Sequence, residues 1–223
     1  MGTYVVRSDG SGPASLVDAS GRLSAWTRDG RLIVITSVEG GLSDVVLHDL
    51  AGGRTVLASD ALTIVQPATS PDGRLVAYMS NRILVAGVDG SGSRPLTDPC
   101  CGSESVASPL RWSPDGRTVA FIHYGDVRMV GVDGAGERVL VPKATSPAWS
   151  PDGQRLAVID ESAKRPDGLL HLTLQTVNAS GGDRRTVFDA GGMSVHMPQW
   201  SPTGRLIAVN VGRVGPAGGP LLP

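Results

Sequence analysis

The sequence predicts an all-β fold built from a repeated four-stranded unit. The first observation is a recurring turn, complete at Trp112 to Gly116, where Trp-Ser-Pro-Asp-Gly precedes the apolar run 119–122. The second is the spacing of its copies, which is close to the length of one four-stranded β-propeller blade. The third is that 30 glycines and 16 prolines fall mostly between apolar runs, which indicates turns rather than disorder. No segment has a useful 3.6-residue amphipathic period, so helices are not expected.

The recurring turn is explained by its own residues. Proline at the second position pre-sets φ for a type I turn, serine and aspartate bind nearby backbone N–H groups, and glycine allows a positive φ. Such a turn connects two strands of a tight hairpin. We therefore interpret Asp72, Asp115 and Asp152 as turn residues, and not as catalytic or metal-binding carboxylates.

The order of events in each repeat predicts a four-stranded blade. The turn glycines are residues 30, 73, 116, 153 and 204, at spacings of 43, 43, 37 and 51. Each repeat has a short strand, the turn, a second strand, a variable connection and a third strand. A second Gly-rich turn, such as Asp89 to Gly92, then leads to a fourth strand.

The two ends of the chain predict how a ring would close. Residues 3–18 have only third and fourth strands, whereas residues 197–211 have only first and second strands. An isolated hairpin is marginal in water, so the two halves are expected to pair into one blade. The prediction is a single five-bladed β-propeller over residues 1–211, followed by a flexible tail at 212–223. The expected blades are 23–59, 66–97, 109–142, 146–189, and 197–211 plus 3–18.

Composition limits the classes of partner. The net charge of −1 gives no electrostatic case for nucleic acid or an anionic membrane. No apolar run approaches the roughly 18 residues that span a bilayer, and no signal peptide is visible at the start. Cys100 and Cys101 are adjacent and cannot join distant segments, so a disulfide framework is not expected and their role stays open.

No catalytic constellation is visible in the sequence. The chain lacks a Gly-x-Ser-x-Gly nucleophile elbow, a phosphate-binding loop, His-Glu-x-x-His and a calcium loop. We therefore expect no catalytic residue, no cofactor and no resident metal. A metal site from His123 and His196 is an alternative, although the spacing fixes no third ligand.

The irregular loops predict which face of the propeller binds a partner. In a blade, the regular Gly turns open on one face, and the second-to-third and blade-to-blade connections open on the other. Binding residues concentrate on variable loops held by a rigid scaffold. The predicted binding face comprises His123, Tyr124, Asp126, Glu161, Lys164, Arg165 and His196. The alternative is that these loops are solvated connections without a partner.

The first strands are expected to line a central channel. The residue before each anchor position is Ala25, Ala68, Arg111, Ala148 or Gln199. Arg111 and Gln199 are candidates for binding a small anionic or polar ligand at the channel mouth, unless they extend into solvent or trapped water. The anchor residues themselves are interpreted as inter-blade core: Trp26, Trp112, Trp149 and Trp200. Thr69 stands at the fifth anchor position, so that wedge should be the least well packed.

The repeated Trp-Ser-Pro-Asp-Gly unit resembles the WD-like propeller repeat of the TolB family, also found in prolyl oligopeptidase-type and tricorn-type propeller domains. The resemblance covers the chain from Tyr4 to about Val211. It implies a periplasmic or extracytoplasmic scaffold that binds other proteins, or a gating domain beside a peptidase. The chain departs from the family in having five expected blades instead of six or more, and in lacking the α/β domain of TolB.

The favoured function is a non-catalytic, monomeric scaffold that binds a protein or a peptide. The rival is a small glycan hydrolase or lyase, which would need two converging carboxylates. The expected channel positions contain none. A third alternative is an excised or engineered ring without activity.

Overall fold

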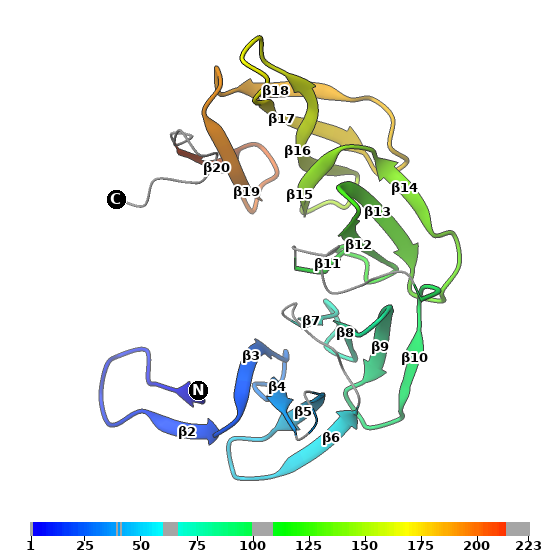
Figure 1. Ribbon diagram of the computed structural model, residues 1–223. Coiled ribbons are helices and arrows are strands. Elements are labelled where there is room, and N and C mark those ends of the chain that lie inside the picture. The colour runs from blue at the N-terminus through cyan, green and yellow to red at the C-terminus, as the bar shows by residue number, and fades with distance from the viewer. Residues whose placement is uncertain (1, 39, 41, 60–66, 100–108, 213–223) are drawn as a thin grey trace. The chain divides into compact units, whose positions relative to one another are not determined.

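The computed structural model describes residues 2–38, 40, 42–59, 67–99 and 109–212. These residues form strands and turns with almost no helix, which confirms the predicted all-β class (Figure 1). None of the described residues belongs to a helix that is long and apolar enough to cross a membrane. Cys100, Cys101 and the predicted tail from residue 213 onward lie outside the described residues.

The chain divides into two compact units, which are described separately below. Unit 1 comprises Met1–Trp112 and Val132–Ala135, and unit 2 comprises Ser113–Gly131 and Gly136–Pro223. The strands of unit 1 are β1 (Thr3–Val5), β2 (Ser15–Asp18), β3 (Gly21–Trp26), β4 (Leu32–Ser37), β5 (Ser43–His48), β6 (Arg54–Ala58), β7 (Ala68–Thr69), β8 (Leu75–Met79), β9 (Ile83–Gly87), β10 (Ser93–Pro95) and β11 (Arg111–Trp112). The strands of unit 2 are β12 (Thr118–His123), β13 (Asp126–Gly131), β14 (Arg138–Val141), β15 (Ala144–Trp149), β16 (Arg155–Lys164), β17 (Leu170–Asn178), β18 (Arg185–Asp189), β19 (Ser194–Trp200) and β20 (Ile207–Gly212).

Among the described residues, four antiparallel sheets have four strands each, in chain order. They are β3-β4-β5-β6, β7-β8-β9-β10, β11-β12-β13-β14 and β15-β16-β17-β18. Four-stranded sheets were predicted from the repeat, and this prediction is confirmed. The hairpins β1-β2 and β19-β20 form separate two-stranded sheets, and no ladder joins them within the described residues. The expected fifth, shared sheet is therefore not confirmed.

The second strand of each four-stranded sheet contains a continuous run of buried residues. In β4, β8, β12 and β16 the apolar runs are buried without alternation. A continuous apolar run is typical of a strand that is covered on both faces. Two of the fourth strands differ, since every residue of β10 and β18 is exposed.

The recurring turn is held by one serine and one aspartate. Ser113 Oγ donates to Asp115 Oδ1 at 2.6 Å and accepts the Thr118 N–H at 3.0 Å. The Arg117 N–H donates to the same carboxylate at 3.0 Å, and Gly116 has φ of 70°. The bond from Ser113, followed by that from the Arg117 N–H, holds the pKa of Asp115 below its ordinary value. The same pattern recurs at the turns that contain Asp72 and Asp152.

Side-chain donors on the first strands tie neighbouring sheets together. In unit 1, Trp112 Nε1 donates to the Ala68 carbonyl at 2.8 Å. In unit 2, Trp200 Nε1 donates to the Ala148 carbonyl at 3.0 Å. Thr69 has no indole, and its Oγ1 donates instead to the Trp26 carbonyl at 3.1 Å. Each of these bonds satisfies a first-strand carbonyl from the next sheet.

A buried carboxylate fastens the N-terminal hairpin to the first four-stranded sheet. Asp18 Oδ2 accepts the Thr36 hydroxyl at 2.7 Å and lies 3.1 Å from His48 Nε2. The Ser20 N–H donates to the other oxygen at 2.8 Å. Burial opposes ionisation of Asp18, but these hydrogen bonds outweigh it and hold its pKa below the ordinary value. The network joins the end of β2 to β4 and β5.

We predict that Asp18→Asn lowers the free energy of unfolding by about 1–3 kcal/mol, because it disturbs a buried hydrogen-bonded network. In urea titrations, Asp18→Asn combined with Thr36→Val should cost less than the sum of the single changes, since both remove one shared bond. Because the pKa of Asp18 is depressed, the difference from wild type should be full at neutral pH and shrink as the pH falls below 3.8.

Asp49→Asn is the matched control for this prediction. Asp49 is exposed and its Oδ1 accepts the Ala51 and Gly53 N–H groups, a role that an amide oxygen retains. This change should therefore stay within about 0.5 kcal/mol of wild type. Strictly additive effects of Asp18→Asn and Thr36→Val, with no dependence on pH, would contradict the network.

Candidate functional site

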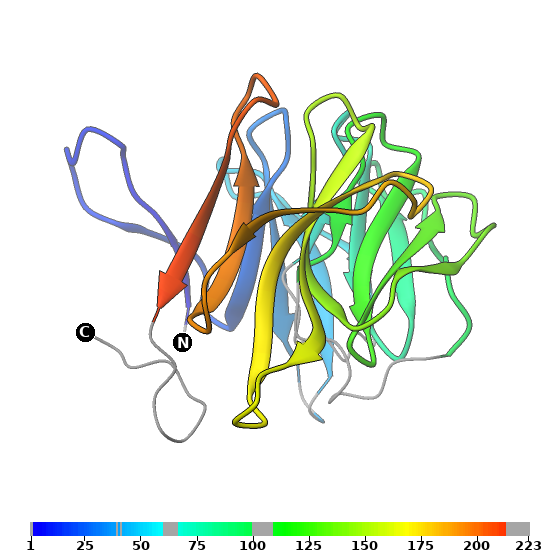
Figure 2. The ribbon, with the colours of Figure 1, turned by 90° about the horizontal axis from the view of Figure 1, so that it is seen from above.

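All seven side chains of the predicted binding face belong to unit 2. Six of them lie in the segments 124–126, 161–165 and 192–197, and His123 directly precedes the first. We call these three segments, together with 143–145, the rim. Figure 2 shows the turns at 150–153 and 201–204 at the top of unit 2, and the yellow turn near 165–168 at the bottom. The irregular 165–168 connection thus lies at the opposite end of these strands from the recurring turns.

Hydrogen bonds link the rim segments of neighbouring sheets. The Ala144 N–H donates to the Gly125 carbonyl at 2.9 Å, and the Lys143 N–H donates to Asp126 Oδ1 at 2.9 Å. The Glu161 N–H donates in turn to the Lys143 carbonyl at 2.8 Å. The carboxylate of Glu161 also accepts the Thr145 hydroxyl at 2.9 Å. Asp126 and Glu161 therefore hold loops together, which makes them positioning residues.

Arg165 is also committed to the structure of the rim. Its Nη1 donates to the Gly192 carbonyl at 3.0 Å, and its Nη2 lies 2.8 Å from Asp167 Oδ2. A Cβ at Gly192 would come within 2.6 Å of that Nη1, so the guanidinium fills the space beside this residue. Lys164, directly before it, is exposed.

Two large apolar side chains stand out from the rim. Tyr124 is 76% exposed and Met197 is 67% exposed. Both have left-handed backbones, with φ of 50° and 52°, which few residues adopt without support from their surroundings. The ring of Tyr124 contacts that of buried His123, with centroids 4.2 Å apart. Tyr124 is thereby held from one side and presented on the other.

The two histidines of the alternative metal site differ in environment. His123 is buried, whereas His196 is exposed and opposite Asn210 in the β19-β20 ladder. Within the described ranges, no group of three or more His, Cys, Asp or Glu side chains is arranged to hold a metal ion.

Sequence reasoning missed the buried Asp160 at the rim end of the apolar run in β16. It accepts bonds from Arg184 at 3.1 Å, from Gln175 at 3.0 Å and from Ser162 at 2.9 Å. The sequence does mark this position, since the acidic residue directly follows the four apolar residues 156–159 of a predicted strand. With three donors, this carboxylate serves the structure of the fourth sheet.

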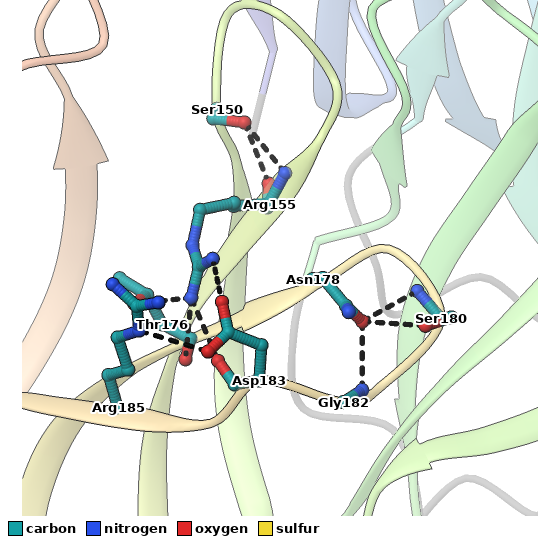
Figure 3. Close-up of polar contacts among 8 residues, drawn as sticks. All are labelled: Ser150, Arg155, Thr176, Asn178, Ser180, Gly182, Asp183 and Arg185. Atoms are coloured by element: carbon teal, nitrogen blue, oxygen red, sulfur yellow. Dashed lines mark hydrogen bonds and ion pairs between the residues drawn. The ribbon is translucent and has the colours of Figure 1, made fainter.

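Two arginines of unit 2 contact Asp183 in the β17-β18 turn (Figure 3). Arg155 Nη1 lies 2.6 Å from Asp183 Oδ2, and Arg185 Nε lies 3.0 Å from Asp183 Oδ1. In the same turn, Asn178 Oδ1 accepts the N–H groups of Ser180 and Gly182. Arg155, Arg185 and Arg205 contribute to a groove of about 530 Å³ whose apolar lining includes Phe188 and Leu206.

A second hollow lies in unit 1 around Thr69, and we call it the Thr69 pocket. It has a volume of about 480 Å³. Its lining comprises Trp26, Thr27, Arg28, Ala68, Thr69, Ser70, Pro71, Leu110, Arg111 and Trp112. The predicted poorly packed wedge and the predicted channel residue Arg111 thus meet in one pocket. Gln199, the other predicted channel residue, is exposed on β19 of unit 2.

Arg111 lies on β11 and remains partly exposed to solvent. Partial burial lowers the pKa of Arg111 from its ordinary value. The guanidinium stays charged at neutral pH, because arginine does not lose its proton in proteins. Arg28 is the second cation of the pocket, and sequence reasoning missed it because it stands where other repeats carry proline.

Comparison with known proteins identifies the fold. No protein-family model matches the chain. The chain is 33% identical over 127 residues to a Bacillus subtilis (strain 168) protein named uncharacterized peptidase YuxL, covering 47% of this chain and 19% of that protein. It is 28% identical over 193 residues to the uncharacterized protein Atu1656 of Agrobacterium fabrum (strain C58), covering 79% of this chain and 64% of the relative. The chain therefore spans less than two thirds of the length of either relative.

Two solved structures illustrate the fold. The putative TolB from Agrobacterium tumefaciens matches with a TM-score of 0.58 and 23% identity, over 92% of this chain and 80% of that one. An oligogalacturonate lyase in complex with manganese matches with a TM-score of 0.64 and 15% identity, over 84% and 57%. Together with the sheets described above, these likenesses define a TolB-like β-propeller fold. They include enzymes, and at these identities they carry the fold alone.

We predict that Arg165→Gln loosens the rim while leaving the sheets intact. The shorter amide loses the paired bonds to the Gly192 carbonyl and to Asp167. Backbone amides near 190–194 should then exchange with deuterated solvent about tenfold faster, which corresponds to about 1.4 kcal/mol. Lys164→Gln, at an exposed neighbour, is the control and should leave exchange unchanged. Equal exchange in the two variants would contradict the positioning role.

Proposed function

We propose that this chain is a protein- or peptide-binding β-propeller module that binds its partner with the rim. The observation that supports this most strongly is the pair Tyr124 and Met197, exposed by 76% and 67% on a hydrogen-bonded rim. Tyrosine and methionine are enriched in protein interfaces, and aromatic anchors carry much of the binding energy. A backbone that is already fixed loses little conformational entropy when a partner binds.

The polar residues of the rim suit the edge of such an interface. Lys164 is exposed, and Glu161 and Arg165 are half-buried beside the loops that they position. Charged groups at an interface edge contribute more to the rate and specificity of association than to affinity. We therefore propose that Tyr124 and Met197 supply most of the binding affinity. The charged residues of the rim, together with Asp126 and His196, would orient the partner and hold the loops in place.

We further propose that the module is a five-bladed ring closed by pairing β20 with β1. Each end hairpin is attached to a complete sheet of its own unit, through Asp18 in one case and Trp200 in the other. Each lacks the two strands that the other would supply. Trp26 is 51% exposed, and the repeat makes the Gln199 carbonyl the counterpart of the acceptors of Trp112 and Trp200.

The repeat also predicts the register of this closure. Residues 9–12 repeat the Asp-Gly-Ser-Gly of 89–92, and Gly204 corresponds to Gly73. In the second sheet Ala77 pairs with Val85. The same offsets place Ala208 opposite Val5.

A disulfide tests the closure. In a Cys100→Ser, Cys101→Ser background, Val5→Cys with Ala208→Cys should form an intramolecular disulfide, seen as a mass loss of two hydrogens in the monomer. Val5→Cys with Val211→Cys is the matched control, since the proposed register separates these positions by three residues. Cross-linking of the control pair alone, or only between molecules, would overturn the five-bladed closure.

A peptide-display selection on the intact chain tests the binding function. Selected peptides should lose at least about tenfold in affinity, or about 1.4 kcal/mol, with Tyr124→Asn or Met197→Asn. Asparagine tolerates the left-handed backbone at both positions, so folding should be kept. Val139→Asn, at an exposed valine of β14, is the control. Peptides that bind all three variants equally, or turnover of a glycan substrate without peptide binding, would contradict the proposal.

A further inference from the structure

The Thr69 pocket arises because one repeat lacks the aromatic ring present in the others. Trp112 Nε1 reaches the Ala68 carbonyl, whereas Thr69 Oγ1 reaches the Trp26 carbonyl at 3.1 Å. The hydroxyl of Thr69 thus replaces the donor function of an indole, but its side chain does not replace the volume of the bicyclic ring. The resulting volume of about 480 Å³ lies in the range of small-molecule sites.

The walls of the pocket suit a planar apolar group. Trp112 lines the pocket and is half-buried, so its indole has surface available for contact. Leu110 adds a buried apolar surface, with 2% of its area exposed. Aromatic rings gain from stacked or edge-to-face contacts beyond the area that they bury.

The charge of the pocket is positive. Arg28 and Arg111 line it, and its lining contains no aspartate or glutamate. The nearest turn carboxylates in sequence have other partners: Asp29 lies 2.8 Å from Arg31, and Asp72 accepts the Ser70 hydroxyl at 2.6 Å. Guanidinium groups bind carboxylates through short, charge-assisted hydrogen bonds.

The pocket is also held in place before any ligand arrives. Arg28 packs against the turn of the second sheet, since a Cβ at Gly73 would come within 3.1 Å of the Arg28 Cβ. Thr27 and Ser70 are buried and hydrogen-bonded to the backbone of their own turns. A pocket that needs little rearrangement binds a small ligand at low conformational cost.

From these observations we infer that the Thr69 pocket binds a planar aromatic anion, with its ring in place of the missing indole and its acidic group at Arg28 and Arg111. This ligand site goes beyond the proposed function, because the pocket lies in unit 1 and shares no residue with the rim. The ligand class is an aromatic ring system of about indole size that carries a carboxylate.

Indole-3-acetate is the probe, and isothermal titration calorimetry on the full chain is the measurement. The probe should bind wild type, whereas tryptamine, with the same ring and a positive charge, should bind at least tenfold more weakly. Arg28→Gln and Arg111→Gln should each weaken binding of indole-3-acetate about tenfold. Arg74→Gln is the matched control, since Arg74 is an exposed arginine of a neighbouring turn outside the pocket.

Thr69→Trp restores the ring within the chain itself. This variant should lose binding of indole-3-acetate and unfold at a higher temperature, because the wedge is filled. If Thr69→Trp does not fold, the affinities of Arg28→Gln and Arg111→Gln for indole-3-acetate test the proposal instead. Absence of binding by wild type at millimolar concentration, equal binding of tryptamine, or unchanged binding by a folded Thr69→Trp variant would each overturn the proposal.

Discussion

The structure depends on one repeated interaction, in which a first-strand side chain donates a hydrogen bond to a first-strand carbonyl of a neighbouring sheet. Trp112 and Trp200 make it with the indole N–H, and Thr69 makes it with a hydroxyl. The first strands β7 and β11 contain only two residues each, whereas β3 and β15, which also supply acceptor carbonyls, contain six. In each case the donor satisfies a backbone carbonyl, and an indole at this position also fills the space beside it.

The pocket in unit 1 lies where this interaction departs from the repeat. Where the donor is a threonine, the hydrogen bond survives but the wedge opens into a pocket between Trp26 and Trp112. At the other end of the sheets the loops carry no such repeat, and their order comes from individual bonds, such as Arg165 to Gly192. Regular positions thus build the sheets, whereas exceptions to the repeat supply the proposed binding surfaces.

The four-stranded sheets could be predicted for two reasons. The residues of the recurring turn explain its local conformation, and the spacing of its copies is close to the length of one propeller blade. The sequence also predicted a weak wedge at Thr69, since a missing tryptophan is visible in the alignment of repeats. The hydrogen-bond partners of individual polar side chains could not be predicted from the sequence. The contacts that join Asp18 to His48, and Asp160 to Arg184, follow from the packing of particular strands, and the residues involved have no fixed spacing. Glu161 and Arg165 were predicted as binding groups because they lie on a variable loop, and the structure gives each a partner within the chain.

In the proposed ring, Trp26 would complete the series of indole hydrogen bonds made by Trp112 and Trp200, with the Gln199 carbonyl as its acceptor. The most direct measurement is solvent exchange of the indole N–H protons of these three tryptophans, followed by NMR in the intact chain and after removal of residues 2–18. We expect all three protons to be protected in the intact chain, and the Trp26 proton to exchange freely in the truncated one. Free exchange of the Trp26 proton in the intact chain, with the other two protected, would contradict the proposed ring.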